Sequence, residues 1–474
     1  MRTHVQELAR FAVACRDEPL PGEVTADVVH RVLDVLGNCL AGRAESEGAA
    51  APDAAVLRLV DGWAGVREAT AVGSGVRLPA PNAALANGTF AHLLDFDDTH
   101  LPSVLHPSAN VVPAALAAAE AADAPTAVLL AAVAAGIEVA NRLGMASYSA
   151  ELGNSVFFDK GLHATSICGA LGAATAAGLA YGLDAEALAS AVGIAASMGA
   201  GLLEANRTGG TVKRVHCGWA AHGGVVAAAL AREGVTGPPT VLEGRFGFFN
   251  AYLDGKYDAA ALTGDLGTRW ELLRTFYKPY PSNHFTHPGI DCALALRARG
   301  LSADEVQHAE LGVAEPVLRT IAEPRALKIR PTTGYHAKFS GPYTVARALL
   351  GGGGLGLHLD DFSEDALADP RLPDLAQRVT MVADESATAR FPDSFAAVLR
   401  VTTCAGRVLE HRVDCSRGGP EHPLSRTELL AKFRLNAVRA LPPNRTERLL
   451  AAVVAMAEGN VDYRHVLDLT MPAD

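Results

Sequence analysis

The stretch ATSICGALGAATAAGLAYGL, residues 164–183, contains no charged side chain, and eleven of its twenty residues are alanine or glycine. Such a run is too weakly apolar for a typical membrane span, whereas its small side chains let neighbouring helices approach closely. It therefore predicts a buried, tightly packed helix. Helical patterns punctuated by Gly, Pro and Asp are also found at residues 28–41, 113–122, 127–143, 185–203 and 218–233.

After about residue 268 the pattern changes from helical to mixed. Strands are predicted at residues 309–317, 379–383, 397–403 and 408–413, the last two as a hairpin. Helical character returns near Ser425, which forms a capping-box pattern with Glu428. We therefore expect a mainly α protein: residues 1–267 and 415–474 form a large helical domain from both chain ends, and residues 268–414 form a smaller α+β lid domain.

Composition limits the partners of this 474-residue chain. Its net charge is −11 without a lysine- or arginine-rich block, so we expect neither nucleic acid nor an anionic membrane as a partner. The N-terminus lacks a secretory apolar region, and the seven cysteines include no CxxC pair. These features predict a reduced, cytoplasmic protein without a thiolate zinc site. An anionic substrate would need a few local cations that act against the overall charge.

The acidic segment Asp95-Phe-Asp97-Asp-Thr99 has two interpretations. Its DxDxT spacing matches a phosphotransferring aspartate, but such a residue follows a buried β-branched strand, and the alanine-rich residues 82–94 predict a helix instead. Continued as a helix, the segment places His92, Asp95 and Thr99 on one face, while Asp97 points elsewhere. Because acids at a helix C-terminus oppose the helix dipole, we expect this face to be functional.

Three further clusters place bases and cations beside apolar helices. His163 stands at the start of the charge-free helix, where the helix dipole favours the neutral imidazole. The other two clusters contain Lys213, Arg214 and His216, and Lys278, Asn283, His284 and His287. HExxH, GxxxxGK[ST] and GxSxG motifs are absent from the sequence. The grouping of acids, bases and cations suits proton transfer on a carboxylated substrate.

The sequence resembles the MmgE/PrpD family. The resemblance rests on landmarks that follow one another in family order between about residues 82 and 343. They are Asn87-Gly88, His92-x-x-Asp95-Phe-Asp-Asp-Thr99, His106-Pro107, Gly161-Leu-His163, Lys213-x-x-His216, Thr236-Gly-Pro238, Leu242-Glu-Gly244, Phe276-Tyr-Lys278-Pro-Tyr-Pro281 and Ala337-Lys338-Phe-Ser340-x-Pro342-Tyr343.

The resemblance implies a homodimer with a metal-independent and cofactor-free site in the cleft between a helical domain and a lid. It implies a pocket whose catalytic residues are Asp95, His106, His163, Lys213 and Lys278. Substrate-binding roles fall to Thr99, with Arg214, His216, Asn283 and His284 as further candidates. The two lysines would stabilise negative charge, and His106 and His163 would act as acid and base in an order left open.

The activity that the resemblance implies is that of a lyase on a small polycarboxylate. Dehydration by α-proton abstraction and hydroxide elimination, as in 2-methylcitrate dehydratase, is the leading expectation. Epimerisation and decarboxylation, as in iminodisuccinate epimerase and cis-aconitate decarboxylase, are the alternatives, and a non-catalytic polycarboxylate-binding relative is a more remote one. Family decarboxylases carry a histidine five residues after the lysine of the KxxP segment, where this chain has Asn283 followed by His284.

Overall fold

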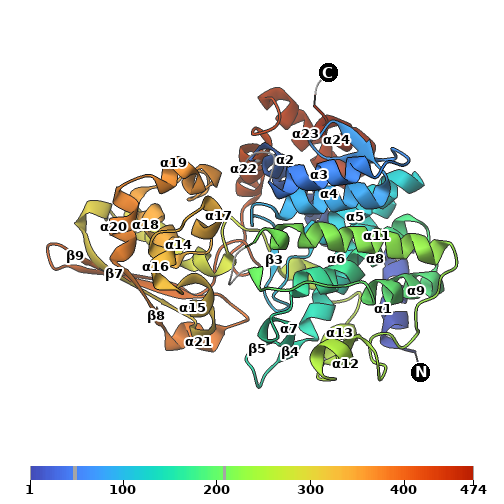
Figure 1. Ribbon diagram of the computed structural model, residues 1–474, viewed down its shortest axis with the longest axis horizontal. Helices are drawn as coiled ribbons and strands as arrows, with labels where there is room; N and C mark the ends of the chain where they lie inside the picture. The colour runs from blue at the N-terminus through green and yellow to red at the C-terminus, as the bar shows by residue number, and fades with distance from the viewer. Residues whose placement is uncertain (1, 46–50, 206–209, 473–474) are drawn as a thin grey trace. The chain divides into compact units, whose positions relative to one another are not determined.

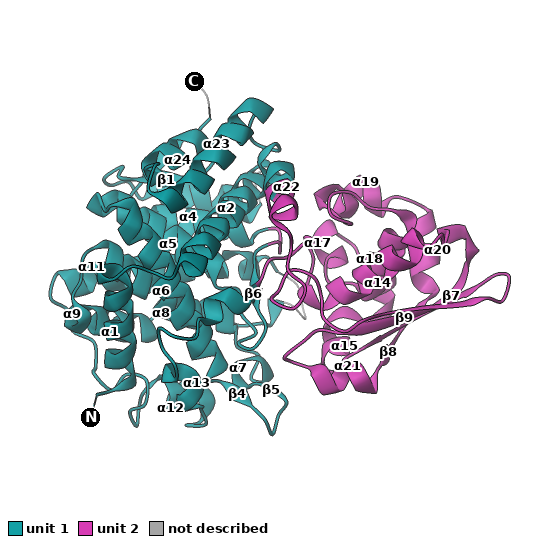
Figure 2. Ribbon diagram, turned by 180° about the vertical axis from the view of Figure 1, so that it is seen from behind, with its two compact units in different colours: residues 1–93, 97–275, 433–474 teal, residues 94–96, 276–432 magenta. Residues whose placement is uncertain are grey.

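The computed structural model describes residues 2–45, 51–205 and 210–472. The chain forms two compact units (Figure 2). The first comprises Met1–Leu93, Asp97–Thr275 and Phe433–Asp474, and the second comprises Leu94–Phe96 and Phe276–Lys432. The predicted domain limits of 267/268 and 414/415 therefore lie 8 and 18 residues before the limits of these units. The sequence did not predict that Leu94–Phe96 belongs to the second unit.

The first unit is mainly helical (Figure 1). Its longer helices are α1 (His4–Asp17), α2 (Gly22–Ala44), α3 (Pro52–Gly62), α4 (Ala80–His92), α5 (Ser108–Ala122), α6 (Thr126–Met145), α8 (Ala164–Ala180), α9 (Ala185–Ala196), α11 (His216–Arg232), α23 (Pro443–Ala455) and α24 (Tyr463–Thr470). Shorter elements are α7 (Val156–Asp159), α12 (Phe248–Leu253), α13 (Ala259–Thr263), η1 (Val212–Val215), η2 (Glu271–Arg274), η6 (Met456–Glu458) and strands β1 (Ala69–Ala71), β2 (Val76–Leu78), β3 (Thr99–His100), β4 (Tyr148–Ser149) and β5 (Asn154–Ser155). Two elements cross a limit between the units: β6 (Thr275–Phe276) and α22 (Arg426–Ala437).

Small residues bring the helices of the first unit close together. Every residue of α8 is buried, as the charge-free stretch predicted. Where α4 crosses α11, a Cβ added to Gly88 would lie 2.7 Å from the Gly218 Cα, so only glycine permits this approach. Because His92 ends α4 and His216 begins α11, the crossing brings together the two helix ends that carry site residues.

The helix α6 also belongs to this core. Among the described residues it is the one helix that is long and apolar enough to cross a membrane, and 89% of its most apolar window is buried inside the protein. Such burial is typical of a core helix in a globular protein. The predicted helix 185–203 ends earlier, at Ala196, and the residues that follow it run beside the start of α8, where the His163 amide donates to the Gly201 carbonyl.

The second unit contains a four-stranded sheet in the order β10-β9-β7-β8. Its strands are β7 (Val306–Val313), β8 (Val379–Ala383), β9 (Ala397–Thr403) and β10 (Val408–Val413). Its helices are α14 (His287–Ala298), α15 (Glu315–Ile321), α16 (Arg325–Ile329), α17 (Gly334–Ala337), α18 (Gly341–Leu350), α19 (Glu364–Leu367), α20 (Arg371–Gln377) and α21 (Glu385–Arg390), with short turns η3 (His284–Thr286), η4 (Ala303–Glu305) and η5 (Leu359–Phe362). The long helix α14 packs against β9, β10 and α18.

The predicted fold class, mainly α with a smaller α+β part, is confirmed, since 58% of the structure is helical. The antiparallel hairpin of β9 and β10 has the predicted bounds. The strand predicted at 309–317 is wrong at both ends, because β7 covers Val306–Val313. Glu315-Pro316 starts α15 instead, and proline fits the first turn of a helix, where its missing N–H breaks no hydrogen bond.

Candidate active site

The acidic segment is not one helical face. Helix α4 ends at His92, and Asp95 adopts a left-handed backbone with φ of 55°. A right-handed helix cannot continue through such a residue, so the predicted shared face of His92, Asp95 and Thr99 is wrong. Thr99 lies instead in the short strand β3. Asp95 belongs to the second unit, whereas His92 and Thr99 belong to the first.

Three buried lysines bind the backbone around Asp95. We call these three lysines, together with Leu94–Phe96, the lysine clamp. Each ammonium group donates to one of three successive carbonyls: Lys338 to Leu94 at 2.6 Å, Lys278 to Asp95 at 2.9 Å and Lys432 to Phe96 at 2.9 Å. The Lys278 Nζ also lies 3.4 Å from the Asp95 Oδ1. Charge-assisted hydrogen bonds are stronger than neutral ones, so the clamp stabilises the left-handed turn and fixes the Asp95 carboxylate.

Thr99 and His106 lie together in the first unit. The His106 Nδ1 is 2.7 Å from the backbone oxygen of Asp98 and 3.3 Å from the Thr99 Oγ1. A carbonyl oxygen only accepts, so Nδ1 carries the hydrogen, and the lone pair of the neutral ring is on Nε2. The side chain of His106 is 15% exposed. Its Nε2 is therefore suited to exchange a proton with a bound molecule.

Asp98 anchors this segment. Its carboxylate accepts from the Arg31 guanidinium at 3.1 Å and from the Ser108 amide and hydroxyl. Burial raises the Asp98 pKa to about 6, although the Arg31 charge acts in the opposite direction. A carboxylate that accepts three hydrogen bonds inside the protein has a structural role. The adjacent Asp97 lies 2.7 Å from the His92 Nδ1 and is likewise fully buried.

His163 and His216 form a pair at the starts of α8 and α11. Their Nδ1 atoms are 2.8 Å apart, so one of the two rings donates and the other accepts. Burial, followed by the charge of Lys213, holds the His163 pKa well below its usual value. Burial also lowers the His216 pKa to about 4. Both rings are therefore neutral near pH 7, as the sequence predicted for His163, but burial is the main cause.

Lys213 is the cation of this region. It lies in η1 immediately before α11, and it is only 6% exposed. Its charge lowers the pKa of both His163 and His216, which places it near both rings. Arg214 is half-buried beside it. Four rings follow one another in the order His106, His92, His163 and His216, with successive centroids 5.0–6.1 Å apart, and we call them the imidazole cluster.

The candidates that follow Lys278 lie inside the second unit. The Asn283 Oδ1 accepts from the Phe285 amide and caps η3, and the His284 Nε2 lies 3.2 Å from the Ser416 Oγ. His287 is fully buried, and burial together with the Lys278 charge holds its pKa well below the usual value. Substrate binding by Asn283 and His284 stays a prediction. Their hydrogen bonds to Phe285 and Ser416 join parts of the second unit to one another.

The structure thus divides the candidate residues into two groups. The first unit contains Thr99, His106, His163, Lys213, Arg214 and His216. The second unit contains Asp95, Lys278, Asn283 and His284, of which Asp95 and Lys278 are in contact. Sequence reasoning missed the contributions of Lys338 and Lys432, because hydrogen bonds to a distant backbone leave no local pattern. It also missed Cys217, which adjoins His216 in the sequence and lies near His92 and Asp97 in space.

Comparison with known proteins identifies the family of this chain. Residues 6–260 match the MmgE/PrpD N-terminal domain, and residues 280–458 match the MmgE/PrpD C-terminal domain. The chain is 31% identical over 384 residues to the cis-aconitate decarboxylase of Homo sapiens, covering 80% of this chain and 77% of that protein. It is 26% identical to the cis-aconitate decarboxylase-like protein oryM of Aspergillus oryzae, covering 98% and 96%. It is 30% identical to the 2-methylcitrate dehydratase of Cupriavidus necator, covering 48% of each chain.

Proposed function

The chain belongs to the MmgE/PrpD family, and we propose that it is a lyase that removes a proton next to a carboxylate of a small polycarboxylate. Relatives named as decarboxylases and as a dehydratase support an enzyme of the lyase kind. The favoured reaction is dehydration, in which α-proton abstraction is followed by loss of hydroxide. No cofactor takes part in the proposed steps.

The neutral His163–His216 pair beside Lys213 carries this proposal. Proton abstraction needs an unprotonated base, and the lowered pKa of His163 supplies one at neutral pH. The negative charge that develops on the substrate needs a preorganised cation, and Lys213 adjoins the base. We assign proton abstraction to His163. Its Nδ1 contact with His216 restrains the ring. Proton abstraction at Nε2 uses the tautomer in which the His163 Nδ1–H donates to the His216 Nδ1, because the lone pair is then on the His163 Nε2.

His106 is the proposed acid. Because its Nδ1–H is directed at the Asp98 carbonyl, the proton available for transfer is on Nε2. In the proposed step His106 begins as the imidazolium, gives the Nε2 proton to the departing hydroxyl group, which leaves as water, and becomes the neutral Nδ1–H ring. Thr99 binds a substrate carboxylate in this proposal. Lys278 is a second cation for the developing charge, and Asp95 is an orienting carboxylate or an alternative base. The hydrogen bond from Lys278 to the Asp95 carbonyl supports a fixed rather than mobile ammonium group.

Decarboxylation is the second candidate, and one specific observation favours it. The relatives that align with 80% or more of this chain are named as cis-aconitate decarboxylases or as like them, whereas the dehydratase aligns with 48%. Against it stands Asn283, which replaces the histidine of family decarboxylases and caps η3 with its side chain. An amide cannot donate the proton that an imidazolium donates, so we favour elimination.

Proton NMR in D₂O, with EDTA present, distinguishes these outcomes. The purified protein is incubated with 2-hydroxytricarboxylates and, separately, with unsaturated tricarboxylates. Dehydration produces a new vinylic signal from a hydroxy acid, decarboxylation removes one carboxylate carbon from an unsaturated acid, and epimerisation exchanges the α-proton with a change in configuration. Absence of all three changes across the substrates, with binding retained, would overturn the proposal and support a non-catalytic polycarboxylate-binding protein.

The same measurement tests the assignment of acid and base. In His106→Gln the base remains, so exchange of the α-proton for deuterium should continue while the vinylic product disappears. In His163→Gln both should be lost. Loss of exchange in His106→Gln with exchange retained in His163→Gln would reverse the two roles.

A further inference from the structure

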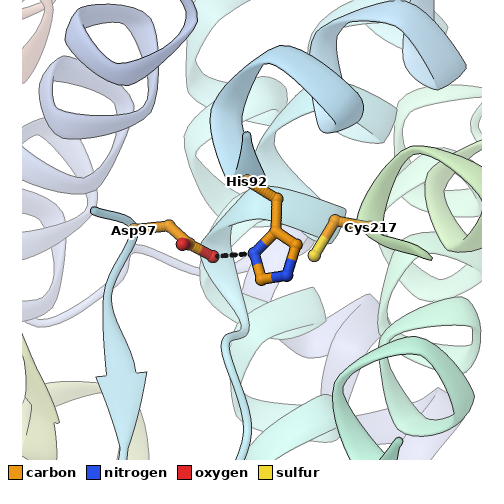
Figure 3. Close-up of side chains that lie close together, drawn as sticks. All are labelled: His92, Asp97 and Cys217. Carbon is orange, nitrogen blue, oxygen red and sulfur yellow. Dashed lines mark hydrogen bonds and ion pairs between the residues drawn. The ribbon is translucent and has the colours of Figure 1, made fainter. Parts of the chain in front are cut away.

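His92 is the one member of the imidazole cluster to which the proposed reaction gives no role. It ends α4 and is 1% exposed. Figure 3 shows its ring between Asp97 on one side and Cys217, the second residue of α11, on the other. One ligand atom from each of these three side chains lies within 4.8 Å of the other two.

Hydrogen bonding fixes the tautomer of His92. The Asp97 Oδ2 lies 2.7 Å from Nδ1, and an ionised carboxylate only accepts, so Nδ1 carries the hydrogen. The lone pair is then on Nε2, which is buried and has no hydrogen-bond partner among the described residues. A carboxylate that holds the Nδ1–H of a histidine is the usual outer partner of an imidazole that binds a metal through its other nitrogen.

We propose that Cys217 and His92, supported by Asp97, form a binding site for a thiophilic divalent cation of the zinc class. The Cys217 thiolate and the His92 Nε2 bind the ion directly, and water completes the coordination. Bond lengths of about 2.3 Å to sulfur and 2.0–2.1 Å to nitrogen place two ligand atoms roughly 3.5 Å apart, a separation that lies within the 4.8 Å limit for the ligand atoms of these three side chains. The thiolate and the Asp97 carboxylate balance the charge of the ion.

The same three residues also resemble the arrangement of an activated thiol nucleophile, but their burial favours the cation. A reactive cysteine needs access to an electrophile, and Cys217 is 0% exposed. A cation needs only a path for a small ion. The proposed entry for the ion is beside His106, whose ring centroid lies 5.3 Å from that of His92 and whose side chain is 15% exposed. The inference does not depend on the proposed lyase activity, because it concerns binding.

Cobalt(II) is the probe for this site, since a cobalt–thiolate bond gives a charge-transfer absorption in the near ultraviolet. The full-length protein is stripped with EDTA, freed of the chelator and titrated with CoCl₂. We expect one thiolate band per chain, which zinc(II) then removes by displacement. Asp97→Asn should weaken cobalt binding about 10–100-fold, the usual effect of losing an outer partner. Cys217→Ser should lose the band.

Cys168→Ser is the matched control. Cys168 is a buried cysteine of the same unit, in α8, so its substitution should leave the band unchanged. X-ray absorption of the zinc-loaded wild-type protein should show one sulfur and one imidazole ligand, and this measurement stands even where Cys217→Ser fails to fold. A thiolate band that persists in folded Cys217→Ser, or a zinc environment without sulfur in the wild-type protein, would overturn the proposal.

Discussion

The lysine clamp and the imidazole cluster both bury groups that ionise, and they use them in opposite ways. In the clamp, three ammonium groups are directed at three successive backbone carbonyls, so positive charge fixes the conformation of Asp95. In the cluster, burial and the nearby Lys213 keep the rings of His163 and His216 neutral. A buried cation with carbonyl acceptors becomes a structural element, whereas a buried imidazole beside a cation becomes a group able to accept a proton.

Loss of the base should have the largest effect. We expect His163→Gln to lower kcat about 10²–10⁴-fold, the usual contribution of a positioned acid or base, with little change in KM. Steady-state kinetics with the substrate identified by NMR measures this change. The control is His222→Gln, a histidine of α11 outside the imidazole cluster, for which activity near wild type is expected. A His163→Gln variant within threefold of wild type would remove His163 from the catalytic set.

Loss of the central clamp lysine should come next. Lys278→Met removes the ammonium group beside the Asp95 carboxylate, and we expect kcat/KM to fall about 10²–10³-fold, as for other preorganised electrostatic groups. The variant should also be less stable, because a buried carboxylate loses its cation. The double variant Lys278→Met with Asp95→Asn should recover stability without activity. Recovery of activity in the double variant would show that the pair is structural only.

Loss of Lys432, a lysine at one end of the clamp, should affect the stability of the protein more than its reaction rate. Lys432→Met removes one charge-assisted hydrogen bond to the Phe96 carbonyl, and we expect the free energy of unfolding to fall by about 1.5–3 kcal/mol. Urea denaturation followed by circular dichroism measures the shift. Lys256→Met, at an exposed lysine, serves as the control and should change stability by less than about 0.5 kcal/mol. Equal shifts in the two variants would contradict the clamp.

The smallest expected effect is on the pH dependence of thermal stability. The folded-state pKa of His216, about 4, lies below its ordinary value of 6.5, so protons bind preferentially to the unfolded chain. His216 therefore contributes to the stability of the folded state fully above pH 6.5, and this contribution is lost as the pH falls toward 4. The decrease in Tm between pH 7 and pH 5 should therefore be smaller in His216→Gln than in wild type. Asp98, whose pKa is raised, titrates in both proteins and cancels in the difference.

Local sequence patterns predicted most helices and strands. Where the prediction was wrong, contacts with residues far away in the sequence determined the structure. The bounds of β9 and β10 follow from alternation within the hairpin itself. The end of α4 does not follow from its own residues, because the left-handed turn at Asp95 is held by lysines 183, 244 and 336 residues away from the carbonyls they bind. The meeting of His92 with Cys217 depends in the same way on the crossing of α4 and α11 at Gly88 and Gly218.

The tripeptide Leu94–Phe96 constrains how this protein is made and how it can be divided. It leaves the ribosome early, yet Lys432, which binds its last carbonyl, is synthesised 336 residues later. The second unit therefore reaches its final structure only when nearly the whole chain exists, after a long loop has closed. A gene fragment encoding residues 276–432 alone lacks the three carbonyls that its buried lysines require. Transplanting this unit to another protein would require a second, separate insertion that supplies them.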